Sequence, residues 1–276
     1  MSSRVLVIGG TGKIGRHLVM ASLNAGHSTA VLIRPVAAGA DCDRARLLED
    51  FVTCGASLVH GDINDREALV AAIGQADVVI CAVGHTLVEE VESQLKIVAV
   101  IQEKKYLQRF MPSEFCIAVE LAEQMLEPVR SIFGAKLRVR EALRAAGVPH
   151  TIIRGNLTQG FLVPRFGNPS DTGLTTILGD GEAQAYLVNE KDISALAIRT
   201  MEDPRTLNRI LHVRPPMNLC SLNRLASLFG RIKSARRSRN TMCVRKISSR
   251  KYKSPRSLST FSWRLCMRPS SWARRR

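Results

Sequence analysis

Short apolar runs alternate with longer amphipathic stretches through the first half of the chain. The apolar runs are rich in valine and isoleucine and carry no regular polar positions, which is typical of strands buried on both faces of a parallel sheet. They predict strands at 5–8, 29–33, 57–60, 78–82, 109–111 and 151–154. The amphipathic stretches predict helices at about 13–25, 43–54, 65–73, 88–104 and 128–146. This order predicts an α/β fold with a doubly wound parallel sheet.

The pattern becomes irregular after residue 154. Prolines and glycines interrupt the chain, and short elements return only at 185–188, 193–201 and 209–213. We therefore expect a first domain over residues 1–154 and a partial, smaller substrate-binding lobe over 155–230. That lobe is expected at the carboxyl side of the sheet, where such folds bind ligands. Residues 231–276 contain 16 basic residues, ten serines and no acid, and predict a disordered basic tail.

Composition narrows the classes of function. The net charge of +16 belongs to the tail, because residues 1–230 contain 24 basic and 24 acidic residues. A neutral body with 5% aromatic residues disfavours a nucleic-acid partner, except for non-specific binding through the tail. No apolar run predicts a membrane span, and the first strand begins too early for a signal peptide. The seven cysteines form no C-x-x-C pair, which predicts reduced thiols, no metal framework and a cytoplasmic location.

Glycines recur at every third position where the first predicted strand meets the first predicted helix. Residues 9–15 read Gly-Gly-Thr-Gly-Lys-Ile-Gly. Glycine permits a positive φ in the turn, lets backbone N–H groups approach a phosphate, and lets the helix pack closely on the strand. This context predicts a dinucleotide site that includes Gly9, Thr11, Gly12, Lys13, Ile14 and Gly15. The alternative is a glycine-rich turn without a ligand.

Two arginines near the second predicted strand indicate which cofactor binds. Arg34 directly follows that strand, where NAD sites place an acid for the ribose 2′-hydroxyl. A guanidinium suits a 2′-phosphate instead, so the sequence predicts NADPH. Arg44, at the head of the next helix, would supply a second charge, and either arginine could alternatively be a solvated surface residue.

Acidic and amide residues follow the third predicted strand. Asp62 would accept a hydrogen bond from the adenine amino group or cap the following helix, and the two interpretations are equally good. Asn64 is the expected N-cap of that helix, because an acid stands three residues after it.

Lys136 is the strongest catalytic candidate. The helix predicted at 128–146 has an apolar stripe, which contains Ile132, Val139 and Leu143. Lys136 falls within this stripe, and an inward lysine near a cofactor cleft loses hydration, which disfavours its charged form and makes it a usable general base. The alternative is a lysine whose stem follows the edge of the stripe out to solvent. Arg138 and Glu141, on the outer face, are expected to pair with each other.

Polar residues also follow two later strands at the same edge of the predicted sheet. Ser113 would donate a hydrogen bond to cofactor or substrate, and Glu114 would orient a lysine, although each could equally be a capping residue. His85 is expected to lie beside the cofactor as a polar loop residue rather than to act as an acid.

Five segments occur in the order found in one known family. They are residues 9–15, Arg-Phe-Met-Pro-Ser-Glu-Phe at 109–115, Lys136 with Val139-Arg140, Gly-Val-Pro-His-Thr at 147–151, and Val-Arg-Pro-Pro at 213–216. With these motifs the chain, over about residues 3–230, resembles the isoflavone reductase-like proteins, which are NmrA-like atypical short-chain dehydrogenases. That family includes phenylcoumaran benzylic ether reductases, pinoresinol–lariciresinol reductases and leucoanthocyanidin reductases.

The resemblance implies an NADPH-dependent reductase of plant phenylpropanoids, built from a Rossmann domain and a smaller substrate domain. Lys136 matches the family's general base, which removes a phenolic proton so that the benzylic C–O bond opens to a quinone methide and hydride adds to it. Arg34 and Arg44 match the basic residues around the 2′-phosphate.

The resemblance also assigns residues to the cofactor and the pocket. Those on the cofactor side are Ser113, Phe115 and Asn156, and Phe161 belongs to the segment that lines the substrate pocket.

Two positions depart from the family. Cys116 stands where the family usually has glycine, and Ile117 stands where the leucoanthocyanidin branch has histidine.

The largest departure follows Leu228, where the family continues with acid- and lysine-rich helices that close the substrate pocket. A change of reading frame or of splicing near residue 230 would produce the basic tail, because Lys and Glu codons read one base out of frame often become Arg codons. The leading hypothesis is therefore a working reductase of a benzylic ether or isoflavone. The alternative is a catalytically impaired NADP(H)-binding protein that lacks the closing helices, and a homodimer is compatible with either.

Overall fold

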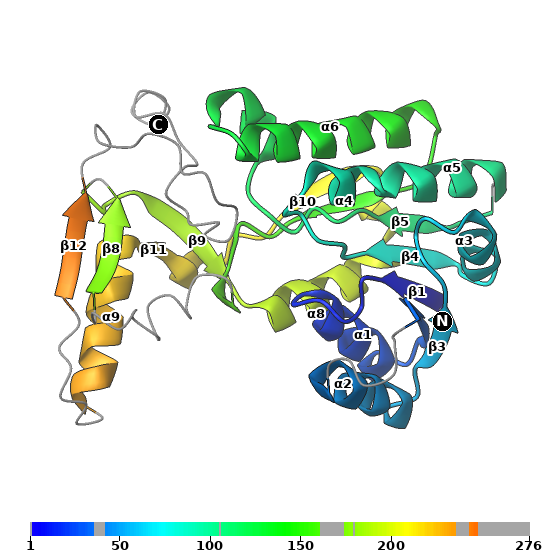
Figure 1. The fold of residues 1–276 in the computed structure, drawn as a ribbon, viewed down its shortest axis with the longest axis horizontal. Helices are drawn as coiled ribbons and strands as arrows, with labels where there is room; N and C mark the ends of the chain where they lie inside the picture. The colour runs from blue at the N-terminus through cyan, green and yellow to red at the C-terminus, as the bar shows by residue number, and fades with distance from the viewer. Residues whose placement is uncertain are drawn as a thin grey trace.

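The computed structural model describes residues 2–35, 42–104, 106–160, 174–178, 180–235 and 243–247 of the 276-residue chain. Its central strands are β1 (Arg4–Ile8), β2 (Ser28–Ile33), β3 (Ser57–His60), β4 (Val78–Cys81) and β5 (Arg109–Met111). They form a parallel sheet in the order β3-β2-β1-β4-β5, with helices on both faces (Figure 1). The predicted α/β fold with a doubly wound sheet is confirmed.

The strands are continuously apolar because the sheet is buried on both faces. Along β1, Leu6 and Ile8 join the core on one face, whereas Val5 and Val7 join the core on the other. All four residues are at most 3% exposed. Burial of each such side chain stabilises the fold by roughly 1.5–3 kcal/mol, so neither face tolerates a polar substitution well.

Helices cover both faces of the sheet. On one face lie α3 (Arg66–Ile73), α5 (Gln94–Lys104) and α6 (Val129–Ala145), and on the other lie α1 (Gly15–Asn24), α2 (Cys42–Thr53) and α8 (Glu190–Met201) (Figure 1). Gly26 and Gly147 follow α1 and α6 with positive φ, as predicted for glycines just past a helix. The helix expected over 88–104 is divided into α4 (Val88–Glu92) and α5 at Ser93, whose hydroxyl donates to a carbonyl of the preceding turn.

The central sheet continues beyond β5 through a second parallel pair. β6 (Thr151–Arg154) meets β5 through a bridge between Phe110 and His150, and β10 (Arg209–His212) pairs with β6. The apolar side of α8 is buried in the same core as α1 and β1. Residues 190–212 therefore return to the first domain, and the expected boundary at residue 154 does not separate two units in space. The linear pattern shows where an element lies along the chain but not against which sheet it packs.

A smaller lobe lies beside the sheet, at the left of Figure 1. Its elements are β7 (Leu157–Thr158), β8 (Leu174–Leu178), β9 (Gln184–Val188), β11 (Leu219–Ser221), α9 (Leu222–Ala235) and β12 (Cys243–Ile247). The strands form a sheet in the order β11-β9-β7 and a separate parallel pair of β8 and β12. Short 3-10 helices complete the described elements, namely η1 (Val119–Gln124), η2 (Pro204–Thr206) and η3 (Pro216–Asn218).

Part of the expected disordered tail has regular structure. Helix α9 continues through residues 231–235, and residues 243–247 form β12. The segment Cys-Val-Arg-Lys-Ile at 243–247 suits a strand because β-branched residues fit a pleated sheet and β8 offers it a parallel partner. Residues 236–242 and 248–276 lie outside the described residues, so the expectation for them stays a prediction.

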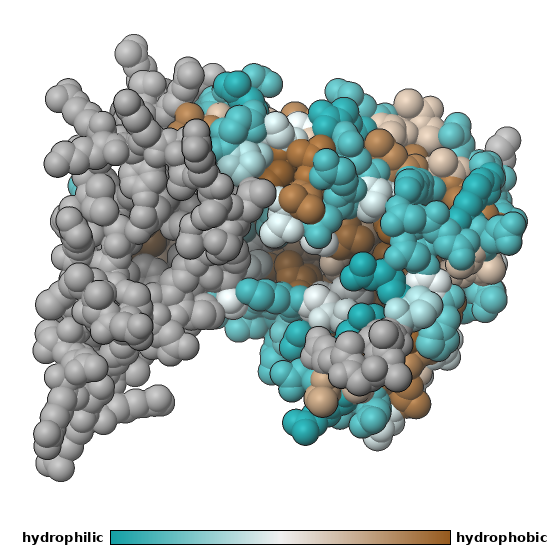
Figure 2. Space-filling model, in the orientation of Figure 1, coloured by the Kyte–Doolittle hydropathy of each residue, from teal (hydrophilic) through white to brown (hydrophobic). Residues whose placement is uncertain are grey.

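One face of the molecule is hollowed across its middle. On the face shown in Figure 2, hydrophobic residues are visible in the depression in the middle of the view, and polar and apolar residues are mixed above and below it. Within the described ranges no helix has the length and apolar character needed to cross a membrane.

Candidate cofactor and catalytic site

The loop after β1 lies where the strand order of the sheet reverses, between β1 and β4, which is where doubly wound folds bind ligands. This loop fits tightly against the end of β4, because a Cβ at Gly9 would lie 2.6 Å from the carbonyl oxygen of Ala82. Gly9 also has a φ of +81°, and a Cβ at Gly15 would lie 2.1 Å from the carbonyl oxygen of Gly9. Glycine is therefore required at both positions for the loop and helix to approach one another.

The amino end of α1 faces this loop without a side-chain cap. Its N-cap residue, Ile14, makes no capping hydrogen bond, and the first turn carries no acid. Thr11 and Gly12 are half-buried in the same turn, and Lys13 is exposed. Backbone N–H groups at a helix amino end favour an anion, so these residues fit the pyrophosphate of a dinucleotide.

The two arginines predicted for the 2′-phosphate lie together. Arg34 directly follows β2 and is exposed. Arg44, in the first turn of α2, donates from Nη2 to the backbone carbonyl of Arg34 at 3.1 Å. Residues 36–41, which connect them, lie outside the described residues. The pair places positive charge at the end of the second strand, where the ribose of a dinucleotide is expected.

Asp62 lies in the turn between β3 and α3. Its Oδ1 accepts a hydrogen bond from the backbone N–H of Asn64 at 2.8 Å, so the carboxylate stabilises this turn. The expected N-cap at Asn64 is wrong, because the N-cap of α3 is Asp65, whose Oδ1 accepts from two backbone N–H groups of the first turn. A carboxylate interacts more favourably than an amide with the positive end of the helix dipole. Asn64 instead accepts a hydrogen bond from Lys96 Nζ at 2.6 Å.

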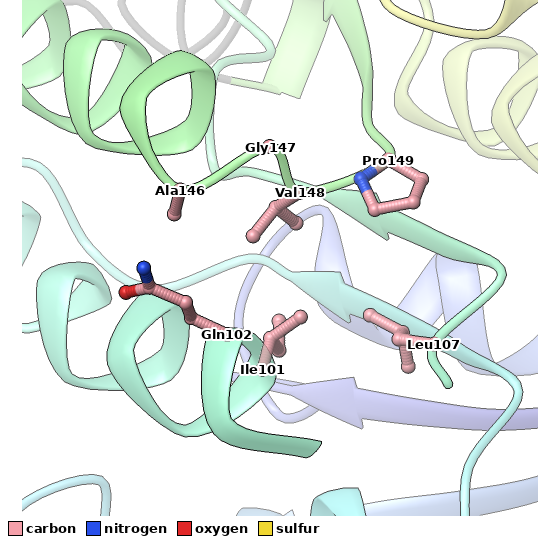
Figure 3. A pocket seen from close by; sticks show the side chains of 7 residues that line it. All are labelled: Ile101, Gln102, Leu107, Ala146, Gly147, Val148 and Pro149. Carbon is pink, nitrogen blue, oxygen red and sulfur yellow. The ribbon is translucent and has the colours of Figure 1, made fainter. Parts of the chain in front are cut away.

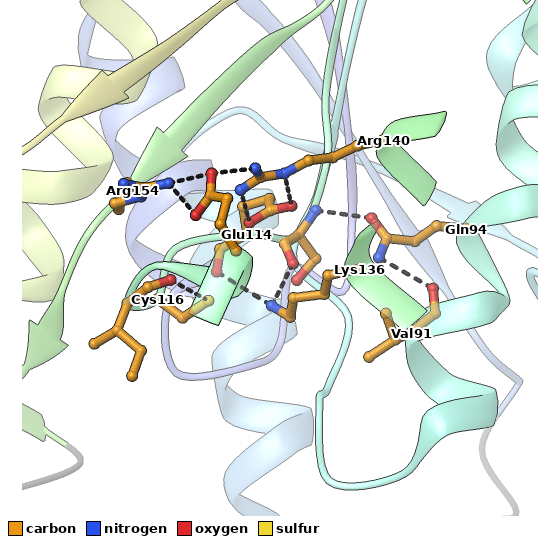
Figure 4. Close-up of polar contacts among 10 residues, drawn as sticks. Val91, Gln94, Glu114, Cys116, Lys136, Arg140 and Arg154 are labelled. Carbon is orange, nitrogen blue, oxygen red and sulfur yellow. Dashed lines mark hydrogen bonds and ion pairs between the residues drawn. The ribbon is translucent and has the colours of Figure 1, made fainter. Parts of the chain in front are cut away.

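Lys136 is buried, with 2% of its surface exposed. It lies on α6 between the core residues Ile132 and Val139. Its Nζ donates to the backbone carbonyl of Ser113 at 2.7 Å and to that of Glu114 at 3.2 Å, both in the loop after β5 (Figure 4). The alternative of a lysine that reaches solvent is therefore wrong, and the amine ends inside the protein at the carboxyl edge of the sheet.

The loop after β5 is held by buried partners on two sides. The hydroxyl of Ser113 donates to the backbone carbonyl of Val83 at 2.9 Å. The backbone N–H of Ser113 donates to Oε1 of Gln94 at 2.8 Å. Phe115 is buried in the core, with a φ of +22°. The contacts of Ser113 with Val83 and Gln94 thus fix the loop.

Two charged side chains find partners on other elements. The carboxylate of Glu114 binds Arg140, and the amine of Lys136 contacts the backbone carbonyl of Glu114 rather than its carboxylate. Arg138 pairs with Glu92 of α4 at 2.6 Å rather than with Glu141 on its own helix. Both acidic partners lie on other elements of the chain, which the spacing along α6 does not indicate.

Asn156 connects β6 to β7 and uses its polar groups within the protein. It has a φ of +54°, and its Nδ2 donates to the carbonyl of Val213 at 2.5 Å. Its backbone N–H donates to the carbonyl of Cys116 at 3.1 Å. Phe161, the residue expected in the substrate pocket, lies outside the described residues.

Titratable groups around Lys136 are influenced by its charge. The His85 ring is solvent-accessible, yet the surrounding protein removes part of its hydration. This desolvation, together with the charge of Lys136, lowers the pKa of His85 against the opposing charge of Glu90. Burial raises the pKa of the Cys116 thiol, although Lys136 opposes the shift. His85 and Cys116 are therefore uncharged at neutral pH, and the loop after β4 lies close enough to α6 for His85 to interact with the lysine.

Sequence reasoning missed two polar residues that shape the site. Glu90 accepts hydrogen bonds from the backbone N–H and hydroxyl of Thr86, at 3.0 and 2.7 Å, and so holds the loop that carries His85. Gln94 lies in the apolar stripe of α5 with Ile97, and its Nε2 donates to a backbone carbonyl of α4. A polar residue inside an apolar stripe is the signal that identified Lys136, and it would have identified Gln94 as well.

A cavity of about 430 Å³ lies away from this site (Figure 3). Its lining comprises Ile101, Gln102, Leu107, Ala146, Gly147, Val148 and Pro149. Leu107 precedes β5 and Pro149 precedes β6, so the cavity is at the amino edge of the sheet, opposite the glycine loop. In the part of the chain that the structure describes, no group of three or more His, Cys, Asp or Glu residues is placed to hold a metal ion.

A doubly wound sheet, a glycine loop at its switch point and a buried lysine at the same edge define a dinucleotide-binding protein of the Rossmann type. Comparison with known families identifies it further. The NmrA-like family matches residues 1–246, and the chain belongs to this family. The match extends past residue 230, where the expected resemblance ended.

Individual relatives agree with this assignment. A phenylcoumaran benzylic ether reductase from Pinus taeda is 42% identical over 234 residues, which cover 82% of this chain and 74% of the relative. The solved structure of AtPrR2 with NADP+ and (+)pinoresinol has a TM-score of 0.79 at 33% identity, over 90% of this chain and 80% of that chain. The binary complex of leucoanthocyanidin reductase with NADPH from Vitis vinifera has a TM-score of 0.79 at 32% identity, over 89% and 78% of the two chains. The predicted resemblance to isoflavone reductase-like proteins is confirmed.

Proposed function

We propose that this chain is an NADPH-dependent reductase of a small phenylpropanoid, either a benzylic ether or an isoflavone, with Lys136 as its general base. The observation that carries the proposal is the buried amine of Lys136 at the carboxyl edge of the sheet, beside the loops that follow β4 and β5. Membership of the NmrA-like family, and relatives named as a phenylcoumaran benzylic ether reductase and a pinoresinol-lariciresinol reductase, support the same class of reaction.

The described residues fit NADPH. The backbone at Gly9 and Gly15 leaves no room for a Cβ, so the amino end of α1 lies close against the loop after β1. Arg34 and Arg44 supply the charge that a 2′-phosphate requires. Asp62 remains a candidate for the adenine amino group, because one of its two carboxylate oxygens serves the local turn. Bound NADPH supplies the hydride of the reduction.

The hydrogen bonds of Lys136 suit a general base. A neutral amine has two N–H donors and one lone pair. The carbonyls of Ser113 and Glu114 accept two hydrogen bonds from Nζ, so the remaining tetrahedral position of the nitrogen is directed away from them. In the neutral amine that position is the lone pair, which can take a proton from a phenol. The same two carbonyls then stabilise the ammonium that forms.

For a benzylic ether, the placement of Lys136 supports the following reaction, which the resemblance to the family implies. Lys136 removes the phenolic proton, and the electrons released by the phenolate open the benzylic C–O bond to give a quinone methide. Hydride adds to the benzylic carbon and restores the aromatic ring, and the oxygen released from the ether takes up a proton. Ser113, Phe115 and Asn156 remain candidates for the cofactor side, and their hydrogen bonds and packing also shape the loops there.

A reducing compartment suits the thiols of this chain. The cysteines that the structure describes are all free, and Cys81 is buried in the core. We therefore propose the cytoplasm as the location of the enzyme.

NADPH oxidation against a panel of phenylpropanoid benzylic ethers and isoflavones tests the proposal, with the full chain and the Lys136→Ala variant. We expect turnover by the wild type with at least one class and loss of turnover in the variant. Binding of NADPH without turnover by the wild type would instead support the catalytically impaired NADP(H)-binding protein. Absence of NADPH binding by folded protein would contradict both.

A further inference from the structure

A buried arginine lies one helical turn after Lys136 on α6. Arg140 is 2% exposed, and all three of its guanidinium nitrogens donate hydrogen bonds to carboxylates. Nε and Nη2 bind the two oxygens of Glu114 at 2.8 and 3.0 Å, and Nη1 binds Glu120 at 2.6 Å (Figure 4). Glu120 also pairs with Arg154 of β6. The network joins α6 to the loop after β5, to η1 and to the last strands of the sheet.

Glu114 contacts two buried basic residues of α6, Lys136 and Arg140, through different groups. Its carboxylate, in a side chain that is 5% exposed, binds Arg140, and its backbone carbonyl accepts a hydrogen bond from Lys136 Nζ at 3.2 Å. The two-point contact between a guanidinium and a carboxylate fixes orientation as well as distance. The Arg140–Glu114 pair and the hydrogen bond to the amine of Lys136 therefore share one residue of the loop.

The unusual backbone conformation of residues 112–115 requires stabilising contacts from the surrounding protein. Phe115 has a φ of +22°, a conformation that residues with a Cβ rarely adopt, and the Glu114 N–H bonds back to the Pro112 carbonyl at 2.8 Å. Residues in such conformations persist only when their surroundings determine them. Here the side-chain oxygen of Gln94 accepts a hydrogen bond from the N–H of Ser113, and Arg140 pairs with the carboxylate of Glu114.

We propose that Arg140 and Glu114 are positioning residues for Lys136. Their ion pair holds the backbone of residues 113–115 so that two carbonyls fix the amine, with its remaining tetrahedral position directed away from them. This inference rests on the proposed role of Lys136 as the base. Burial of an ion pair is weak evidence for a stabilising role, because apolar or neutral residues of similar volume often stabilise a core as well.

The test compares a neutralised pair with a matched surface pair on the same helix. Arg140→Gln/Glu114→Gln removes both buried charges together and so leaves neither of the two uncompensated, while Glu120 keeps Arg154. The control is Arg138→Gln, which breaks the exposed ion pair with Glu92 two residues from Lys136. Arg140→Lys, which keeps the charge but not the two-point contact, serves as a second variant if the double variant does not fold.

Two measurements separate positioning from general stability. Steady-state NADPH oxidation with a phenylcoumaran benzylic ether gives kcat and KM. Carbon-13 lysine NMR of the NADPH-bound protein reports the amine directly, because the two ε-methylene protons of a fixed lysine differ in shift and those of a mobile lysine merge. The signal of Lys136 is assigned by its loss in Lys136→Arg. The melting temperature of every variant is measured alongside.

We expect the double variant to lose at least tenfold in kcat, with KM for NADPH within twofold, and to merge the two ε-proton signals of Lys136. The Arg138→Gln control should match the wild type in kcat, in the KM for NADPH and in the separation of the ε-proton signals. Separate ε-proton signals in the Arg140 variants would overturn the proposal, whatever their activity. An inactive wild type would instead count against the proposed reaction, and the NMR comparison would still decide whether the pair positions the amine.

Discussion

Replacing Gly15 by alanine tests whether the glycine loop is built for close approach to a dinucleotide. The added Cβ would lie 2.1 Å from the carbonyl oxygen of Gly9 and 2.8 Å from the Cα of Gly10. Ordinary contact begins near 3.4 Å, so the first turn of α1 and the loop must separate by about 1.3 Å. Overpacking against backbone that cannot rotate away costs about 1–3 kcal/mol in the free energy of unfolding.

The same displacement weakens cofactor binding. It moves the amino end of α1 away from the loop that the pyrophosphate would contact. Loss of one charge-assisted hydrogen bond costs about 1.5–3 kcal/mol, which corresponds to an increase of about tenfold to a hundredfold in the Kd for NADPH. Fluorescence titration gives the Kd, and urea unfolding of the same samples gives the stability.

Gly134→Ala is the matched control. Gly134 lies within α6, and a Cβ there would meet its nearest neighbour, Arg138 Nη1, at 3.6 Å, which is ordinary contact. This variant should gain about 0.5–1 kcal/mol from helix propensity and leave NADPH binding unchanged. Wild-type stability and NADPH affinity in Gly15→Ala would refute the interpretation of the loop, since the substituted chain would then have room that the structure does not show.

Two further outcomes follow from charges in the structure. Arg34→Asp should raise the Kd for NADPH at least about tenfold by removing a charge-assisted contact, while NADH binds as well or better, and titration with each coenzyme measures the ratio. Burial alone would raise the pKa of Glu120, but hydrogen bonds from Arg140 and the charges of Arg140 and Arg154 outweigh it and lower the pKa. A carboxyl whose pKa is lower in the folded than in the unfolded chain stabilises the fold above its unfolded pKa, and this stability is lost as the pH falls through the folded value. Glu120→Gln should therefore flatten the decline of urea-unfolding stability below about pH 5, and an unchanged decline would contradict the role of the pair.

Much of the fold could be predicted because burial leaves a direct trace in the sequence. The run from Val5 to Ile8 is apolar at every position since alternate residues enter two different cores. The glycine spacing at 9–15 and the place of Lys136 in an apolar stripe reflect equally local requirements. Where residues 190–212 pack could not be predicted, because their own pattern does not show which sheet they join.

The interior polar contacts could be predicted only in part. Helical spacing offers Arg138 a partner on its own helix, but its partner Glu92 is 46 residues away in sequence. The buried guanidinium of Arg140 is paired with Glu114, 26 residues away in sequence. An arginine without an acidic partner nearby in the sequence is expected at the surface. The amide of Asn156 donates to a backbone carbonyl 57 residues later, a contact that no local pattern indicates. Long-range pairs of this kind become visible only in the folded chain.

A single-turnover experiment with deuterated NADPH and a phenylcoumaran benzylic ether examines most directly whether the coenzyme and the buried amine act together. Wild type should transfer deuterium from the coenzyme to the benzylic carbon, and Lys136→Ala should bind NADPH with wild-type affinity but transfer at a rate lower by about 10²–10⁴-fold. Transfer by Lys136→Ala at the wild-type rate would show that the amine is not the base and would contradict the mechanism.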